Sequence, residues 1–159
     1  MATEKMCFLD KNRNIMIAVD ESENAKRALL YVAEFLGGIP GFWVSILSVI
    51  PGPPVDYFKT DEERSEWINR KKTEAATLLD DYRRILVQSG FGENNIEQLA
   101  EINSCPSVAD CILNERQRLN CDTLVIGRRG ISKKEEFLFG STSSKIVHSA
   151  RNCAVWVIE

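Results

Sequence analysis

Five short apolar segments alternate with longer amphipathic segments along most of this 159-residue chain. The apolar segments are rich in β-branched residues and have the length of buried strands, whereas the amphipathic ones repeat apolar residues every three or four positions, as helices do. Strands that alternate with helices through short loops form right-handed crossovers and a parallel, helix-covered sheet. We therefore expect an α/β fold with helices on both faces, strands at 14–20, 42–50, 96–102, 123–126 and 154–158, and a last helix at 141–149.

Capping residues mark the helix boundaries. Ser22 precedes a run with helical spacing, and Gly37-Gly38 should end that helix. Thr60 followed by Glu63 is a capping-box signature for a long second helix. Pro106 suits the first turn of a third helix.

The length fits a single domain over residues 1–159, with 1–13 as an N-terminal arm. A net charge of -3 argues against a general nucleic-acid binder, which normally has a strong basic excess. The apolar runs are too short to cross a bilayer, and the first residues lack the extended apolar stretch of a secretory signal. We expect a cytoplasmic protein that has neither nucleic acid nor membrane as a partner.

The five cysteines do not suggest a disulfide framework, because their number is odd and their spacing irregular. No Cys-x-x-Cys pair indicates zinc or redox chemistry either. With His148 as the only histidine, we expect no metal site and no Ser-His-Asp catalysis. We expect the cysteines to be structural residues that behave as small apolar side chains: Cys7, Cys105, Cys111, Cys121 and Cys153.

The glycines near the C-terminus suggest a phosphate-binding cradle. Gly127 ends the fourth predicted strand, Gly130 follows it, and Gly140 precedes the last predicted helix, which begins at Ser141-Thr142. Glycine lets a ligand approach the main chain, and a helix start offers bare N–H groups and a positive dipole end. The alternative is that these glycines only form turns.

Asp20 stands at the carboxyl end of the first predicted strand. In dinucleotide-binding folds a carboxylate near a strand end commonly accepts hydrogen bonds from ribose or base. It can equally hold the turn ahead of the next helix through its own side chain. From this residue alone the two interpretations stand equal.

Other nucleotide-binding motifs are absent from the sequence. It contains no Gly-x-x-x-x-Gly-Lys-[Ser/Thr], and no Gly-x-Gly-x-x-Gly follows the first predicted strand. No dense carboxylate cluster is evident for metal-assisted phosphoryl transfer. The basic residues between the glycines either reach the phosphates or are simply solvated: Arg128, Arg129, Lys133 and Lys134.

The chain resembles the universal stress protein family, in its ATP-binding branch, from about Asn14 to Glu159. The resemblance is carried by Ile-Ala-Val-Asp-Glu-Ser at 17–22 and by Gly-x2-Gly-x9-Gly-Ser-Thr at 127–142, the family's nucleotide-binding motif. It implies a sheet in the order 3-2-1-4-5, as in adenine nucleotide alpha hydrolase-like folds. It also implies ATP as the ligand, with Mg²⁺ a possible companion of the phosphates.

Carried over by position, the resemblance implies a set of nucleotide contacts. Asp20 and Ala18 would contact the adenosine, Val49 the adenine, and Ile126 with Gly127 the ribose and base. Arg129 adds positive charge between the paired glycines and would alter the phosphate contacts. The residues around the phosphates would be Gly130, Gly140, Ser141 and Thr142.

The last predicted strand, 154–158, is apolar throughout and would lie at a sheet edge. The resemblance implies a homodimer formed through it, since an exposed apolar edge favours association. The alternative is burial under the last helix or under residues 6–9. We expect a nucleotide-dependent regulatory module without catalytic residues. Slow ATP hydrolysis or phosphotransfer at the same site, and a scaffold that never meets nucleotide, are the other hypotheses.

Overall fold

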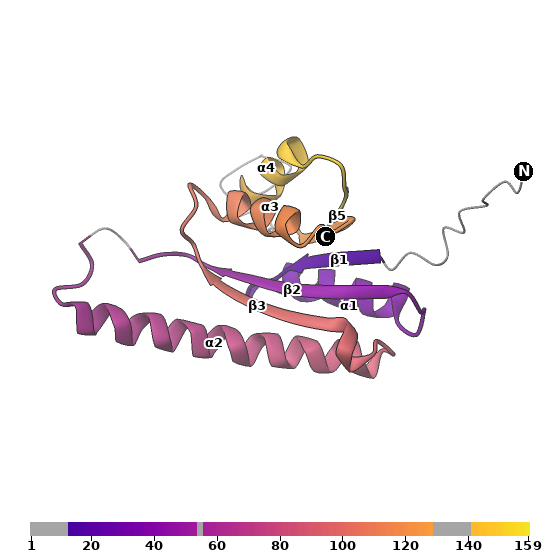
Figure 1. The fold of residues 1–159 in the computed structure, drawn as a ribbon, viewed down its shortest axis with the longest axis horizontal. Helices are drawn as coiled ribbons and strands as arrows, with labels where there is room; N and C mark the ends of the chain where they lie inside the picture. The colour runs from indigo at the N-terminus through magenta and orange to yellow at the C-terminus, as the bar shows by residue number, and fades with distance from the viewer. Residues whose placement is uncertain (1–12, 54–55, 129–140) are drawn as a thin grey trace, which may run out of the picture.

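The computed structural model describes residues 13–53, 56–128 and 141–159, which form one five-stranded sheet covered by helices (Figure 1). The strand pairs are parallel, and their order across the sheet is β3-β2-β1-β4-β5. The expected parallel sheet and its order are confirmed. The strands are β1 (Arg13–Ala18), β2 (Phe42–Ile50), β3 (Ile96–Ile102), β4 (Thr123–Gly127) and β5 (Ala154–Ile158).

Helices cover both faces of the sheet, as expected. Along β1, Ile15 and Ile17 pack with buried residues of the first two helices, whereas Met16 packs with those of the last two. Because neighbouring side chains of a strand point to opposite faces, the helices form two separate layers (Figure 1). One layer has α1 (Glu23–Leu36) and α2 (Asp61–Gln88), the other α3 (Val108–Arg118) and α4 (Ser141–Ser149), and the short turn η1 (Glu93–Asn95) precedes β3.

Helix α2 is buried only along its second half. Its buried residues run from Ala75 to Leu86, while the turns before Ala75 are exposed or half-exposed. In Figure 1 this first half extends beyond the sheet. It is held by local contacts such as the Lys71–Glu74 ion pair (2.7 Å). By contrast, α1 has buried residues along its whole length: Ala25, Ala28, Leu29, Val32, Ala33 and Leu36.

The predicted caps of the first two helices are confirmed. The Ser22 hydroxyl accepts a hydrogen bond from the Ala25 N–H (3.2 Å), and Thr60 Oγ1 accepts one from the Glu63 N–H (3.2 Å). In a usual capping box the Glu side chain accepts from the N–H of the N-cap residue. Here the Glu63 carboxylate accepts from the N–H of Lys59, one residue before the N-cap (2.9 Å). Local side-chain chemistry thus sets both helix starts.

The start of α3 and the end of β1 differ from the prediction. Pro106 lies before α3 and not in its first turn, because Ser107 is the N-cap and its hydroxyl caps the helix. Strand β1 ends at Ala18 and not at residue 20. The chain still runs beside β2 for one more residue, since the Val19 N–H donates to the Leu47 carbonyl (2.8 Å).

The predicted stop at Gly37-Gly38 is confirmed, and it coincides with the end of α2. Gly37 is the C-cap of α1, and Gly38 has a φ of 77°. Gly90, just after α2, has a φ of 110°, and a Cβ there would lie 2.7 Å from the Gly38 nitrogen. The two helix ends therefore meet through their main chains.

The prediction that the cysteines are unpaired is wrong for Cys105 and Cys111, which form a disulfide with their Cα atoms 5.5 Å apart. The spacing gave no sign of it, because only the turn from β3 into α3 brings the two residues together. Cys121 is buried and free, as predicted, and burial raises the pKa of its thiol to about 11. Cys153 is also free and half-buried.

Candidate functional site

An open pocket lies at the carboxyl ends of the three central strands. The strand register places Ala18 of β1 level with Leu47 of β2 and Ile126 of β4, and these three side chains line the pocket. Its cavity volume is about 130 Å³. In an open parallel sheet ligands bind where the strand order reverses, which here is at β1.

The starts of two helices, α1 and α4, form further walls of the pocket. Ser22 and Ala25 come from the beginning of α1, and Thr142 and Ser143 from the first turn of α4. The pocket thus combines an apolar row from the sheet with hydroxyls and main-chain N–H groups at helix N-termini. An apolar lining with a few convergent polar groups is typical of small-molecule sites.

The structure places most of the predicted site residues in this pocket. Ser141 begins α4 beside the pocket and is exposed, outside its lining. Arg129, Gly130 and Gly140 lie outside the described residues. The nucleotide contacts of all ten residues remain a prediction. Those that line the pocket are Ala18, Asp20, Val49, Ile126, Gly127 and Thr142.

The prediction missed the pocket wall that α3 provides. Val108 and Ile112 lie one turn apart on α3 and line the pocket, with Ile112 only 4% exposed. Their apolar spacing is that of any helix core, so periodicity alone does not single them out. A topological signal was available, since a helix that follows a parallel strand starts at the carboxyl edge of the sheet, where the pocket lies.

Asp20 has the local role that the sequence left open. Its Oδ1 accepts a hydrogen bond from the Ser22 N–H (2.9 Å), and its main-chain carbonyl lies 3.4 Å from the donating hydroxyl of Tyr82 on α2. Burial, and then the charge of Asp20, raise the pKa of Tyr82, so its hydroxyl keeps its proton. Among the described residues Asp20 Oδ2 has no partner, so the carboxylate can hold the turn and still accept from a ligand.

Gly127 is required by the packing of α1. A Cβ at this position would collide with the main chain of Asn24 and lie 2.7 Å from the nitrogen of Ala25. The first turn of α1 therefore rests directly on the end of β4. This close approach explains the glycine without a ligand, and it fixes one corner of the pocket.

We expect Gly127→Ala to lower the free energy of unfolding by about 1–3 kcal/mol, because α1 must move away from β4 to admit the methyl group. Urea denaturation measures the change. Gly92→Ala is the matched control, since a Cβ there would meet its nearest atom, Asn95 Cγ, at an ordinary 3.6 Å. Equal urea midpoints for both variants would show that the contact with α1 leaves room for a Cβ at residue 127.

A second, larger hollow of about 480 Å³ lies on the other face of the sheet, beside the first half of α2. It shares Asp20, Ser22 and Val49 with the first pocket. Trp67 and the Lys71–Glu74 pair lie along its α2 side. The two hollows therefore adjoin at the turn that Asp20 holds.

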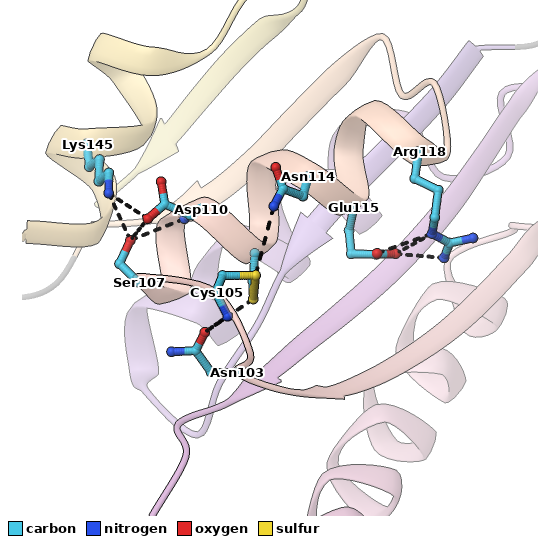
Figure 2. The surroundings of a disulfide bond; sticks show 9 residues. Asn103, Cys105, Ser107, Asp110, Asn114, Glu115, Arg118 and Lys145 are labelled. Carbon is cyan, nitrogen blue, oxygen red and sulfur yellow. Dashed lines mark hydrogen bonds and ion pairs between the residues drawn. A yellow bond between two sulfur atoms is a disulfide. The ribbon is translucent and has the colours of Figure 1, made fainter. Parts of the chain in front are cut away.

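A charged contact ties α4 to α3 beside the pocket. Lys145 Nζ of α4 donates to Asp110 Oδ2 (2.6 Å) and to the Ser107 hydroxyl (3.1 Å), and the Ser107 hydroxyl donates to the same carboxylate (2.7 Å) (Figure 2). These hydrogen bonds, led by that from Lys145, hold the pKa of Asp110 below 3.8. The contact is fully present above pH 3.8 and is lost as the pH falls through the lowered pKa.

We expect Lys145→Met to raise the pKa of Asp110 toward 3.8, because its strongest donor is removed. Carbon-13 NMR titration of the side-chain carboxyl measures the pKa. Arg151→Met is the control, since Arg151 donates to the carbonyls of His148 and Ala150 and leaves Asp110 untouched. An unchanged titration in Lys145→Met would refute the contact in solution.

Within the described parts of the chain, no cluster of three or more His, Cys, Asp or Glu is arranged to hold a metal ion. None of the described helices combines the length and apolar character needed to cross a bilayer.

Comparison with known proteins identifies the family. The model of the universal stress protein family matches residues 11–159. The chain belongs to this family. No curated protein sequence gives a significant match.

Solved structures share the fold of this family member at low sequence identity. UspA from Lactobacillus plantarum has a TM-score of 0.73 at 20% identity over 94% of this chain and 99% of its own. The Archaeoglobus fulgidus universal stress protein in complex with dAMP has a TM-score of 0.64 at 24% identity, over 92% and 98%. A family protein from Arabidopsis thaliana with AMP bound has a TM-score of 0.65 at 22% identity, over 92% and 90%.

Proposed function

We propose that this protein binds an adenine nucleotide in the pocket at the ends of β1, β2 and β4, and that the nucleotide is ATP accompanied by Mg²⁺. The observation that carries the proposal is the apolar row of Leu47, Ala18 and Ile126 beside a carboxylate with an available oxygen and the start of α4. A flat base suits the row, ribose hydroxyls suit the carboxylate, and an anion suits a helix start. The AMP and dAMP complexes of structurally similar proteins support the proposal.

In this arrangement each part of the nucleotide has its own partners. Val49 and the apolar row contact the adenine, and Asp20 Oδ2 accepts from the ribose. Ser141 and Thr142, at the start of α4, bind phosphate oxygens through main-chain N–H groups and hydroxyls. By the sequence motif, the other phosphate-binding residues are Arg129, Gly130 and Gly140.

The protein is proposed to act as a homodimer formed through β5. This strand lies at the sheet edge with β4 as its neighbour. Trp156 of β5 lies edge-on to the rings of Tyr31 and Phe35 on α1, at centroid distances of 6.1 Å. Tyr31 and Phe35 are 43% and 58% exposed. An unpaired edge beside exposed aromatic rings favours contact with a second copy.

We assign the dimer a regulatory role in a cytoplasmic stress response, in which nucleotide occupancy changes the surface that a partner recognises. Among the described residues nothing favours hydrolysis or phosphotransfer. Arg128, a candidate for phosphate contact, pairs instead with Glu159 (2.9 Å). Its guanidinium is thereby directed toward the end of β5.

Mass spectrometry of ligand released from the purified protein, followed by calorimetric titration with AMP, ADP and ATP with and without Mg²⁺, tests the proposal. An adenine nucleotide in the purified protein and tightest binding of ATP with Mg²⁺ are the expected results. CTP is the matched control for the base. No heat with any adenine nucleotide at millimolar concentration would refute nucleotide binding, and tighter binding of AMP would refute the assignment of ATP.

A further inference from the structure

The disulfide lies next to the pocket wall that α3 provides. Cys105 precedes Ser107, the N-cap of α3, and Cys111 lies within the first turns of the helix. Val108 lies between the two cysteines and Ile112 follows the second, and both line the pocket. The loop that the bridge closes therefore contains Val108 and ends one residue before Ile112. Figure 2 shows the bridge at the start of α3.

The two cysteines differ in their exposure to solvent. Cys105 is half-buried between the exposed residues Ser104 and Pro106, whereas Cys111 is only 4% exposed. We therefore expect an external thiol to attack at Cys105 and not at Cys111. This asymmetry fixes which sulfur is attacked and which leaves in a thiol–disulfide exchange.

The surroundings of the bridge also suit the reduced form. Asn103 Oδ1 accepts a hydrogen bond from the Cys105 N–H (3.1 Å) and lies 3.2 Å from Cys111 Sγ. Once Cys111 carries a proton, its thiol can donate to that same oxygen. Asn114 Nδ2 lies 3.9 Å from Cys105 Sγ and donates toward it. The buried thiol of the reduced pair thus has a hydrogen-bond acceptor ready.

The rest of α3 stays attached when the bridge is open. Lys145 of α4 contacts Ser107 and Asp110 (Figure 2), and Ala109 and Ile112 are buried in the core. Opening the bridge therefore releases the connection at Cys105 without unfolding the helix. The expected change is a less ordered connection before α3, and with it a less ordered Val108 in the pocket wall.

We propose that Cys105 and Cys111 are a reversible dithiol–disulfide pair, a modification site through which thiol redox state sets the affinity of the pocket. The effect on affinity rests on the proposed nucleotide binding, whereas the change in α3 does not. In a reducing compartment a disulfide is usually transient and serves redox sensing. The oxidised form, with its wall held in place, binds nucleotide more tightly because less conformational freedom is lost on binding.

The exchange is balanced with a dithiol of the thioredoxin type as the reductant. One of its thiolates attacks Cys105 Sγ, the Cys105–Cys111 bond breaks, and Cys111 leaves as a thiolate that takes up a proton. The second thiolate of the reductant then attacks the reductant's first sulfur, which is bonded to Cys105 in the mixed disulfide. Cys105 is released as a thiolate and takes up a proton. The protein gains two electrons and two protons, and the reductant leaves as a disulfide.

The test equilibrates the full chain in buffers of defined reduced-to-oxidised dithiothreitol ratio and counts alkylated cysteines after denaturation. The bridge holds two cysteines, so the reduced protein is expected to have two more alkylated cysteines than the oxidised protein, and five in all. In the same samples hydrogen exchange of residues 104–112 and the Kd for ATP with Mg²⁺ are measured. Reduction is expected to speed exchange in that segment and to raise the Kd about fivefold or more.

Matched variants identify the cysteines involved. Cys105→Ser should behave like the reduced protein in every buffer, whereas Cys153→Ser, at a free half-buried cysteine, should keep the full response. Five alkylated cysteines at every ratio, or unchanged hydrogen exchange on reduction, would overturn the proposal. An equal Kd in both states would overturn it too. If nucleotide binds in neither state while hydrogen exchange of residues 104–112 still responds to reduction, the proposed function is refuted. The reversible redox pair is then retained without an effect on nucleotide binding.

Discussion

An Ala18→Leu variant is expected to bind adenine nucleotide at least about 100-fold more weakly than the unaltered protein, a loss of about 2.7 kcal/mol. Ala18 lies in the centre of the apolar row, level with Leu47 on one side and Ile126 on the other. Both neighbours are almost fully buried. An isobutyl group in place of the methyl group must therefore enter the space assigned to the adenine. Calorimetric titration with ATP and Mg²⁺ measures the loss.

The matched control for this variant is Ala76→Leu, the same change on an exposed position of α2. It should bind nucleotide as the unaltered protein does. Thermal unfolding of both variants shows whether a loss of affinity comes from a filled pocket or from a destabilised fold. Unaltered affinity in a folded Ala18→Leu protein would place the nucleotide elsewhere on the molecule.

A Val157→Lys variant is expected to dimerise at least about 100-fold more weakly, which makes it a monomer of 18.0 kDa at micromolar concentration. Val157 lies on the edge strand β5 and is half-buried on the α3–α4 side. A two-fold interface brings the same strand of both copies together, so each copy would place a lysine in it and apolar contact would be lost. Light scattering coupled to size exclusion measures the mass.

Val147→Lys is the control for charge alone, because Val147 lies on α4 with 47% of its surface exposed. It should leave the dimer intact. A dimeric Val157→Lys protein would move the interface away from β5. A monomer in the unaltered protein at high concentration would refute the homodimer itself.

The fold was largely predictable because its determinants are local. Alternating apolar and amphipathic segments defined the strands and helices, and the side chains of Ser22 and Thr60 defined where two helices start. The error in the start of α3 arose because two neighbouring residues both suit a helix start. Pro106 and Ser107 can each begin a helix, and the hydroxyl of Ser107 decided the boundary.

The candidate site was predictable only in part, because the pocket depends on contacts between distant segments. Asp20 was found at a strand end, where topology places ligands, and Val49 through the family resemblance. Val108, and the bridge from Cys105 to Cys111, follow from how the chain turns after β3, which no local pattern reveals. Gly127 was assigned to ligand approach, whereas its contact with the main chain of Asn24 becomes visible only in three dimensions.

The overhang of α2 has a consequence for how this protein diversifies. Its turns before Ala75 contribute no fully buried side chain, so their exposed residues are constrained mainly by helix formation. Substitutions there alter the outer surface at little cost to folding. Related proteins can thus acquire new recognition surfaces along the projecting half of α2 while the sheet and its pocket stay the same.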